Sequence, residues 1–472
     1  MLPSGGLASM SYDAFRYLAG ADSILASGKY LDPSGAPQSH WPPGTSIVYA
    51  IAASLSSRPP EELVEFVNLA ALLLTAGSLW VAIEVTIERW WIAIITFASI
   101  LLNTGILALH NKLWSDPLAL AISSAAMASG IVACRGGKNW FGWICLASVF
   151  LSIAICLRFA MLPGIPILTA VAFWLSTRSA SHREAVLLPL LSPFVTLISF
   201  YLLGSSPFSH SNAYSPTALV TITAFDIQNQ WQAFPPAAYQ FLSSVVPTWL
   251  SLSIVVLALI AVPAGAAFAS STTPEKRGVL LVCVGYVLLY CIFLVIAQAS
   301  VHSFLALRYV LLVYPILLIG AALAADLLLS RRRLGLRVLG FFIIGLLSIA
   351  AVRSIRAAVL GILSHGSQQS AVCVSRETLL DDLKRIPPIQ NASRVLTNIQ
   401  GLAWYALRIP SVELTSRSLA DASSGTVIIF ARPRYLCSEV LDSEQVDEIT
   451  LTRAPDVRII SSGSALLISR KD

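Results

Sequence analysis

Long apolar runs recur along this chain, and they limit what it can fold into. About ten stretches are mostly apolar over roughly 18–25 residues, which is the length that a helix needs to cross a bilayer. Over all 472 residues, 56% are hydrophobic and only 12% are charged. A water-soluble domain of this length does not have such a balance. The sequence therefore predicts an all-α polytopic bundle, integral to the cell membrane and surrounded by membrane lipids.

The expected spans lie near 62–86, 90–108, 117–134, 140–157, 160–177, 185–204, 246–269, 279–299, 308–329 and 334–356. A shorter apolar stretch at 44–57 is bounded by Arg58, Pro59 and Pro60. It is too short to span, so an interfacial or re-entrant helix is expected there.

Basic residues cluster between the spans, where they set the orientation of the chain. Although the net charge is +6, these short clusters do not indicate nucleic-acid binding. The clusters are at 135–138, 178–183, 276–277 and 331–337. If these are cytoplasmic, the first loop (1–60), the long loop 205–245 and everything after about 360 lie outside. The chain would then begin outside, so we expect a further span upstream of Met1, with a weakly inserted N-terminal tail as the alternative.

The last part of the chain, residues 364–472, has a different composition from the membrane domain at 1–363. Charged and turn-forming residues are spread throughout it. Helices are expected at 376–385 and 401–407, and strands at 394–397, 411–414, 426–431 and 457–461. The sequence thus predicts a small α/β extracytoplasmic domain. Its two cysteines, Cys373 and Cys437, could form a disulfide or remain free thiols.

The most distinctive polar stretch is Tyr12–Gly44, near the start of this apolar chain. Asp13, Arg16 and Tyr17 have helical spacing, so one helix face can present all three. Gly28 is expected to end that helix. The sequence from His40 and Trp41 to Gly44 cannot continue a helix but can begin one, because proline is tolerated in a first turn.

Other polar groups gather at the expected outer ends of the spans. They are His110, Lys112, Asp116, Arg158, Arg308 and Tyr309. Acids within spans are few, and Glu84, Glu88 and Asp326 are expected near the cytoplasmic ends, where they can reach water. Ion-coupled transporters usually place acids at mid-membrane, so this pattern favours one cavity that faces outwards.

Acids and arginines at one membrane surface suit group transfer from an anionic lipid carrier. A carboxylate can deprotonate an acceptor, and arginines can hold a phosphate leaving group. Structural alternatives remain for each residue. Asp13 and Asp116 could be helix-start acids, Arg158 and Arg308 could be interfacial arginines, and His40 and His110 could be loop residues. No cluster has metal-ligand spacing, so no cofactor is assigned and a divalent metal is left open.

Several stretches together resemble the GT-C superfamily of glycosyltransferases, which use polyprenyl- or dolichyl-phosphate sugars and include protein mannosyltransferases and aminoarabinose transferases. YDAFRYLAGADSILASGKY followed by HWPPGTSIVYAIAASL resembles the first extracytoplasmic loop of that family. LWSDPLALAISS, LRFAMLPGIPIL and LRYVLLVYPILLIGAAL are similar to later motifs in the same order, and RVLTNIQGLAWYALRIPSVEL is similar to the domain after the bundle. Each motif alone is weak, and their joint order carries the resemblance.

The resemblance implies roles for individual residues. Asp13 would be the catalytic base, and Asp116 would help to position the donor or acceptor. Arg158, Arg308 and Lys112 would bind the donor phosphate. The substrate cavity would include Arg16, Tyr17, His40, Trp41, His110 and Tyr309. Many relatives have a second acid directly after the first, whereas Ala14 stands there in this chain.

The sequence therefore predicts an enzyme that passes a sugar from a polyprenyl-phosphate donor to a lipid, glycan or protein acceptor on the outer side. Two other classes of protein remain open. A transporter or flippase of lipid-linked saccharides would place polar residues along a path through the membrane. A membrane scaffold without catalytic activity would scatter its outer charges around the bundle.

Overall fold

The computed structural model describes most of the helical part of the chain and the strands of its C-terminal part. The described residues are 12–39, 41–110, 115–179, 182–206, 260–268, 272–301, 311–364, 394–397, 404, 411–414, 426–431, 457–462 and 465–470.

The chain begins with short helices and continues into longer ones. They are α1 (Tyr12–Ser27), α2 (Gly44–Ser56), η2 (Pro60–Leu63), α3 (Val64–Thr86), α4 (Trp90–Leu101), α5 (Thr104–Leu109), α6 (Ser115–Ala133), α7 (Trp140–Leu157), η3 (Phe159–Met161), α8 (Gly164–Ser179), η4 (Arg183–Val186), α9 (Leu187–Leu190) and α10 (Ser192–Leu202). Further along the chain follow α14 (Val262–Phe268), α15 (Pro274–Val301), α17 (Tyr314–Leu329) and α18 (Leu334–Ser364).

Six helical segments within the described residues are long and apolar enough to cross a membrane. They are Pro60–Thr86, Ser115–Ala133, Trp140–Leu157, Phe159–Arg178, Pro274–Ile296 and Leu334–Arg353. A seventh is the pair Arg183–Leu190 and Ser192–Leu202, if its 41° bend is counted within one span. Pro189 and Pro193 flank that bend, and each removes a backbone donor from the helix. The protein is thus a mostly helical, multi-pass membrane bundle.

The remaining expected spans differ from the prediction in specific ways. The span expected at 90–108 is divided, because the side chain of Asn103 accepts hydrogen bonds from the backbone of Gly105 and Ile106 and so begins α5 as a new helix. The span expected at 308–329 appears as the 16-residue helix α17, and residues 302–310 lie outside the described part of the chain. Most of the span expected at 246–269 also lies outside it.

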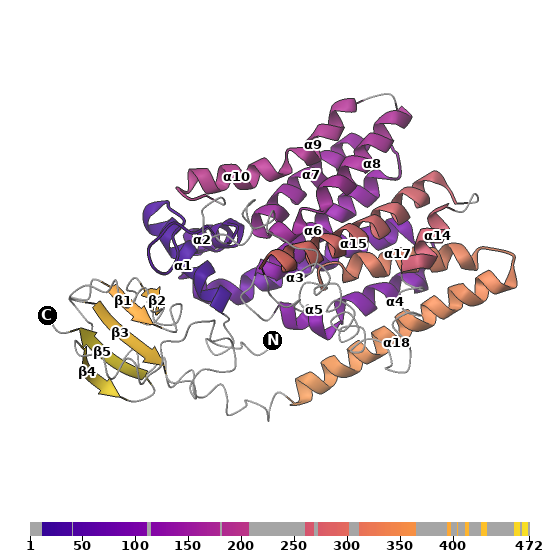
Figure 1. Ribbon diagram of the computed structural model, residues 1–472. Coiled ribbons are helices and arrows are strands. Elements are labelled where there is room, and N and C mark those ends of the chain that lie inside the picture. Colours follow the sequence, from indigo (N-terminus) through magenta and orange to yellow (C-terminus); the bar gives the residue numbers. More distant parts are fainter. Residues whose placement is uncertain are drawn as a thin grey trace.

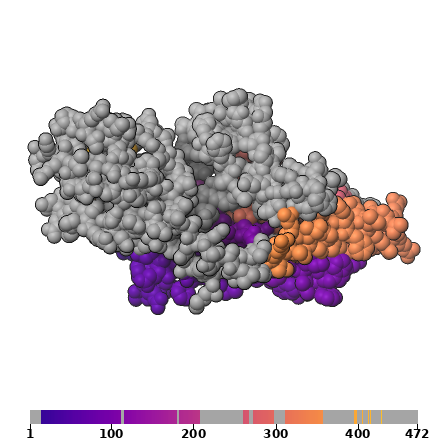
Figure 2. Space-filling model, turned by 90° about the horizontal axis from the view of Figure 1, so that it is seen from below, coloured from indigo at the N-terminus to yellow at the C-terminus, as the bar shows by residue number. Residues whose placement is uncertain are grey.

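Helix α6 lies at the centre of the bundle. Within its apolar membrane-crossing part, 89% of the residues are buried inside the protein. The corresponding share for Pro60–Thr86 is 33%. Its sequence, SDPLALAISSAAMASGIVA, is rich in alanine and serine. Because lipid supplies no hydrophobic driving force between helices, they associate by close packing, which small side chains allow. Figure 1 shows α6 between α7 and α3, while α18 lies at the edge beside α4, and the two also adjoin in the view of Figure 2.

The opening helices pack at one end of this bundle, between it and the C-terminal sheet (Figure 1). As expected, α1 ends at Ser27 and Gly28 takes a positive φ of 69°, while α2 begins directly after Pro43. A Cβ atom on Gly44 would lie 2.5 Å from the carbonyl oxygen of Cys156. Only glycine therefore lets the start of α2 meet the end of α7 at this distance.

The C-terminal part forms a five-stranded sheet with the order β2-β1-β3-β5-β4. Its strands are β1 (Arg394–Thr397), β2 (Ser411–Glu413), β3 (Thr426–Ala431), β4 (Val457–Ser462) and β5 (Ala465–Arg470). Strands β2, β1 and β3 are parallel, whereas β5 is antiparallel to both β3 and β4. Four strands match the prediction and β5 was missed. The backbone N–H of Ser411 donates to the carbonyl oxygen of Pro33 over 2.8 Å, so the sheet contacts the opening loop.

The basic connections meet at the opposite end of the bundle. Arg178 lies 3.9 Å from Glu275, and the ammonium group of Lys276 lies 2.5 Å from the carboxylate of Glu88. Since α6 has 19 residues, it separates the two ends of the bundle by about 28 Å. These contacts place two of the four expected basic clusters, 178–183 and 276–277, at one end.

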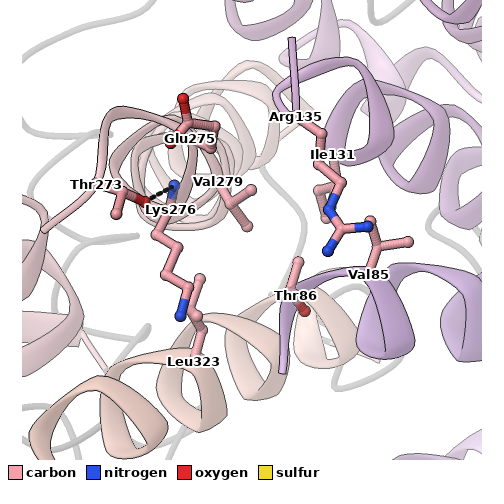
Figure 3. Close-up of a pocket in the computed structure, with 9 residues that line it drawn as sticks. All are labelled: Val85, Thr86, Ile131, Arg135, Thr273, Glu275, Lys276, Val279 and Leu323. Atoms are coloured by element: carbon pink, nitrogen blue, oxygen red, sulfur yellow. Dashed lines mark hydrogen bonds between the residues drawn. The ribbon is translucent and has the colours of Figure 1, made fainter. Parts of the chain in front are cut away.

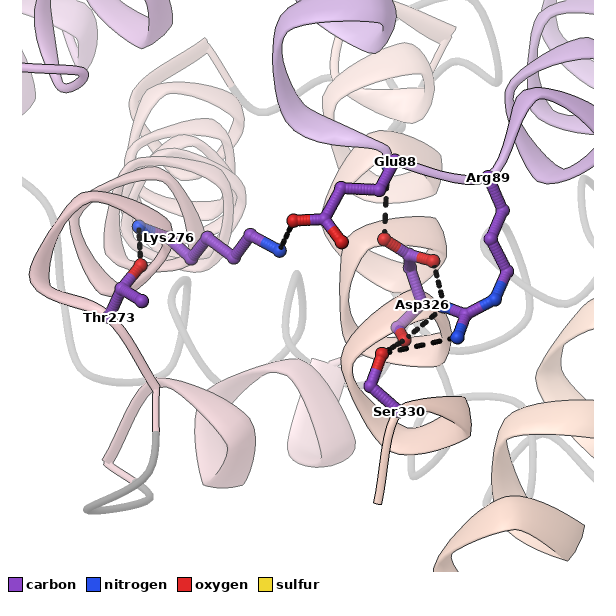
Figure 4. A network of polar contacts seen from close by, with 6 residues as sticks. All are labelled: Glu88, Arg89, Thr273, Lys276, Asp326 and Ser330. Carbon is purple, nitrogen blue, oxygen red and sulfur yellow. Dashed lines mark hydrogen bonds and ion pairs between the residues drawn. The ribbon is translucent and has the colours of Figure 1, made fainter.

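One acid at this end behaves differently from the prediction. Asp326 was expected to reach water, but only 1% of its side chain is exposed. Its carboxylate pairs with the guanidinium group of Arg89 and accepts from the backbone N–H of Glu88 over 3.1 Å (Figure 4). Because a buried charge needs such partners, this pair ties the connection between α3 and α4 to α17.

Candidate functional site

Three helices meet at a buried polar junction at the end of the bundle near α1. The hydroxyl group of Tyr17, on α1, donates to Oγ of Ser115 over 3.0 Å. The guanidinium group of Arg158 donates to the same oxygen over 3.1 Å. Arg158 also lies 2.5 Å from the carboxylate of Asp116. These four residues, Tyr17, Ser115, Asp116 and Arg158, are called the polar junction below.

Local sequence explains how the helices present these groups. Asp116 is in the first turn of α6, followed by Pro117, so the acid lies where the helix dipole favours negative charge. Arg158 follows the last residue of α7 and has extended backbone angles, with φ −160° and ψ 122°. This change of direction ends the helix and carries the side chain toward α6.

Burial makes the pair between Asp116 and Arg158 important for the fold as well as for any chemistry. Only 1% of the Asp116 side chain and 13% of the Arg158 side chain are exposed. Removing one partner of a buried ion pair costs roughly 3–5 kcal/mol, because it leaves the other charge uncompensated. The guanidinium group therefore has a fixed position at the edge of the buried region.

The opening stretch surrounds this junction with aromatic rings. The rings of Tyr17 and Trp41 are 6.3 Å apart, tilted by 59°. The indole nitrogen of Trp41 is buried and has no hydrogen-bond partner among the described residues. Tyr30 is fully buried nearby, and burial raises the pKa of its hydroxyl well above its usual value near 10. The stretch that the sequence singled out therefore folds against the bundle.

The other predicted site residues are placed less completely. Asp13 lies in α1, but its side chain is outside the described part of the structure. Arg16 is half-buried on the same helix. Lying outside the described residues are His40, Lys112, Arg308 and Tyr309. The long loop's aromatic and proline residues after position 206 lie outside them too.

His110 directly follows α5 and is buried, with 5% of it exposed. Its Nδ1 lies 2.8 Å from the carbonyl oxygen of Ile106, while Nε2 is buried without a hydrogen-bond partner among the described residues. Burial lowers the pKa of the imidazole below its usual value near 6.5. A neutral ring is therefore favoured in the folded protein.

Ser115 is the member of the junction that sequence reasoning missed. Its hydroxyl group links Tyr17, which is 98 residues away, to Arg158, which is 43 residues away. Its only sequence signal is a place beside Asp116 at a helix start, which is typical of a capping residue. Within the described residues, no group of three or more His, Cys, Asp or Glu side chains could hold a metal ion. The cation beside Asp116 is Arg158.

The fold, but not the sequence, is similar to solved structures. No protein-family model matches the chain, and no curated protein matches it. The crystal structure of ArnT from Cupriavidus metallidurans in the apo state matches with a TM-score of 0.60 and 13% identity, over 98% of this chain and 93% of ArnT. ArnT bound to undecaprenyl phosphate matches with the same score and identity, over 98% and 94% of the two chains.

A more distant match is the archaeal oligosaccharyltransferase AglB from Archaeoglobus fulgidus, in complex with an inhibitory peptide and a dolichol-phosphate. Its TM-score is 0.50 at 12% identity, over 85% of this chain and 60% of AglB. The chain therefore has a fold similar to those of ArnT and AglB. Its architecture is similar to that of ArnT along almost the full length of both chains, which confirms the resemblance at the level of fold.

The hydrogen bonds of Ser115 predict energetic coupling between α1 and α6. We expect Tyr17→Phe and Ser115→Ala to lower the free energy of unfolding, and the double variant to deviate from additivity by about 0.5–3 kcal/mol. Denaturant unfolding of the four proteins measures this coupling. Ser152→Ala is the matched control, since that hydroxyl group bonds to Ser148 within α7, and it should be additive with Tyr17→Phe. If the Tyr17 and Ser115 substitutions were as additive as those of Tyr17 and Ser152, the predicted coupling through the Ser115 hydroxyl group would be contradicted.

The lowered pKa of His110 predicts a loss of stability in acid. Burial of the neutral ring stabilises the fold fully above the unfolded pKa near 6.5. That contribution is lost as the pH falls from 6.5 through the lower folded pKa, because protonation then favours the unfolded chain. The thermal unfolding midpoint should therefore fall less in His110→Gln than in the wild type between pH 7.5 and 5. His182→Gln, at a half-exposed histidine, should follow the wild type.

Proposed function

We propose that this protein is a membrane glycosyltransferase, which moves a sugar from a polyprenyl-phosphate donor to a lipid, glycan or protein acceptor on the extracytoplasmic face. The observation that carries the proposal is the polar junction, where a nearly buried arginine is held beside an acid at one end of an ArnT-like bundle. ArnT has been crystallised with undecaprenyl phosphate and AglB with a dolichol-phosphate, which supports a polyprenyl-phosphate carrier here.

Arg158 is proposed to contact the donor phosphate. Asp116 and Ser115 contact its guanidinium group. The side chain is therefore already ordered before the donor binds, so less conformational entropy is lost on binding. An arginine fork can form two parallel hydrogen bonds with a phosphate group. The same group stabilises the negative charge that grows on the phosphate as it leaves. In this proposal Asp116 positions Arg158, while Lys112 and Arg308 add positive charge to the donor site.

Asp13 is proposed as the general base. Its place on α1 is one helical turn before Arg16 and Tyr17, so α1 brings it toward the same end of the bundle as the polar junction. The carboxylate takes the proton of an acceptor hydroxyl or amine, and the freed lone pair bonds to the anomeric carbon. The bond between that carbon and the phosphate oxygen breaks, and its electron pair leaves on the polyprenyl phosphate. Inversion at the anomeric carbon follows from the family resemblance.

The remaining residues are proposed to shape the substrate cavity. Arg16, Tyr17 and Trp41 would line it from the opening stretch, with His40 and His110 near the acceptor and Tyr309 near the donor. The C-terminal sheet contacts the opening loop through Ser411 and Pro33, so an acceptor would approach close to this domain. Residues 1–363 would then carry the chemistry, and residues 364–472 would face the acceptor.

The test is transfer of radiolabelled sugar from polyprenyl-phosphate donors in membranes that contain the protein. Asp13→Asn should lower the rate by roughly 100-fold or more at equal expression, because general base catalysis typically contributes 10²–10⁴-fold. Glu62→Gln is the matched control, since it removes one exposed carboxylate from η2 and should leave transfer unchanged.

Each contrary result has a defined meaning. Equal transfer by the wild type and Asp13→Asn would remove Asp13 from the chemistry. Movement of a lipid-linked saccharide across the bilayer, without transfer of its sugar, would replace the enzyme proposal by transport.

A further inference from the structure

A polar cavity lies at the basic end of the bundle, about 28 Å along α6 from the polar junction. Its volume is about 270 Å³. It lies where α3 and α6 end and α15 begins, with α17 on one side (Figure 3). The proposed glycosyl transfer does not use this cavity.

Two cations face this cavity from different parts of the fold. Arg135 follows the end of α6, and Lys276 is in the first turn of α15 (Figure 3). Lys276 is already paired with Glu88, at 2.5 Å. Arg135 is exposed, and its guanidinium group makes no ion pair or hydrogen bond with any residue that the structure describes.

The acids around the cavity are already matched by cations. Glu88 pairs with Lys276, and the Glu275 carboxylate lies 3.9 Å from Arg178. Figure 3 shows that carboxylate turned away from the ammonium group of Lys276. The positive charge of Arg135 is therefore left over at the cavity, and the start of the 28-residue helix α15 adds a partial positive charge. One net positive charge matches one singly charged phosphate diester.

Besides Thr86 and Thr273, the uncharged part of the lining is apolar and lies at the depth of lipid headgroups. Val85, Ile131, Val279 and Leu323 supply this part of the wall. The membrane-crossing segments end at Thr86 and Ala133 and begin at Pro274, so the cavity is at the boundary between hydrocarbon and water. Cations above an apolar wall suit a lipid phosphate with its glycerol and chains better than a free anion. Basic pockets between spans at this depth are typical sites for anionic lipid headgroups.

We propose that this cavity binds the phosphate headgroup of an anionic membrane phospholipid, with Arg135 and Lys276 as its cationic contacts. Arg135 provides the unpaired charge, and Lys276 shares its ammonium group between Glu88 and the phosphate. The bound lipid would bridge α3, α6, α15 and α17 at the basic end, and so stabilise the bundle at the end that lacks the polar junction.

The test uses the purified full-length protein in a zwitterionic detergent and follows its thermal unfolding midpoint. Phosphatidylglycerol should raise the midpoint, whereas phosphatidylcholine and inorganic phosphate should not. Arg135→Gln should require about fivefold more phosphatidylglycerol for the same shift, since one basic residue near a membrane surface contributes about that factor. Arg135→Lys should recover most of the response.

Arg332→Gln is the matched control, because it removes an exposed charge from the same end without touching the cavity. It should respond to phosphatidylglycerol like the wild type. An unchanged response in Arg135→Gln would overturn the proposal, and so would an equal loss in Arg332→Gln, which would indicate diffuse surface attraction. Stabilisation by inorganic phosphate alone would overturn the assignment to a lipid.

Discussion

The ion pair between Asp116 and Arg158 is the interaction on which the end of the bundle beside α1 depends. An acid with 1% of its side chain exposed needs a cation close by to be stable as an anion, and the guanidinium group of Arg158 lies 2.5 Å from it. That cation is fixed by the end of α7, and Ser115 extends the contact to Tyr17 on α1. The pair thus joins the centre of the bundle to the polar stretch that opens the chain.

Much of the fold could be predicted from the sequence, because apolar length and turn residues act locally. The helix end at Gly28 and the helix start after Pro43 follow from backbone preferences. The break at Asn103 was missed because this residue lies within an otherwise continuous apolar run. Its side chain accepts hydrogen bonds from the backbone N–H groups of Gly105 and Ile106, and so competes with the hydrogen bonds of a continuous helix. Strand β5 was missed as well, although it pairs with β3 and β4 in the sheet.

Contacts between distant residues could not be predicted in the same way. The sequence marked Tyr17, Asp116 and Arg158 separately, but only the fold shows that they share the hydroxyl group of Ser115. Asp326 was misplaced for a related reason. An acid near a helix end reaches water unless a partner covers it, and its partner Arg89 is 237 residues away in the chain.

The central claim is that Arg158, held by Asp116, marks where a polyprenyl phosphate binds. The most direct measurement is an experimental structure of the protein with undecaprenyl phosphate bound. The account predicts that the phosphate group lies within hydrogen-bond distance of the Arg158 guanidinium group, with the ion pair to Asp116 intact. A phosphate bound elsewhere, with Arg158 buried away from it, would contradict the account.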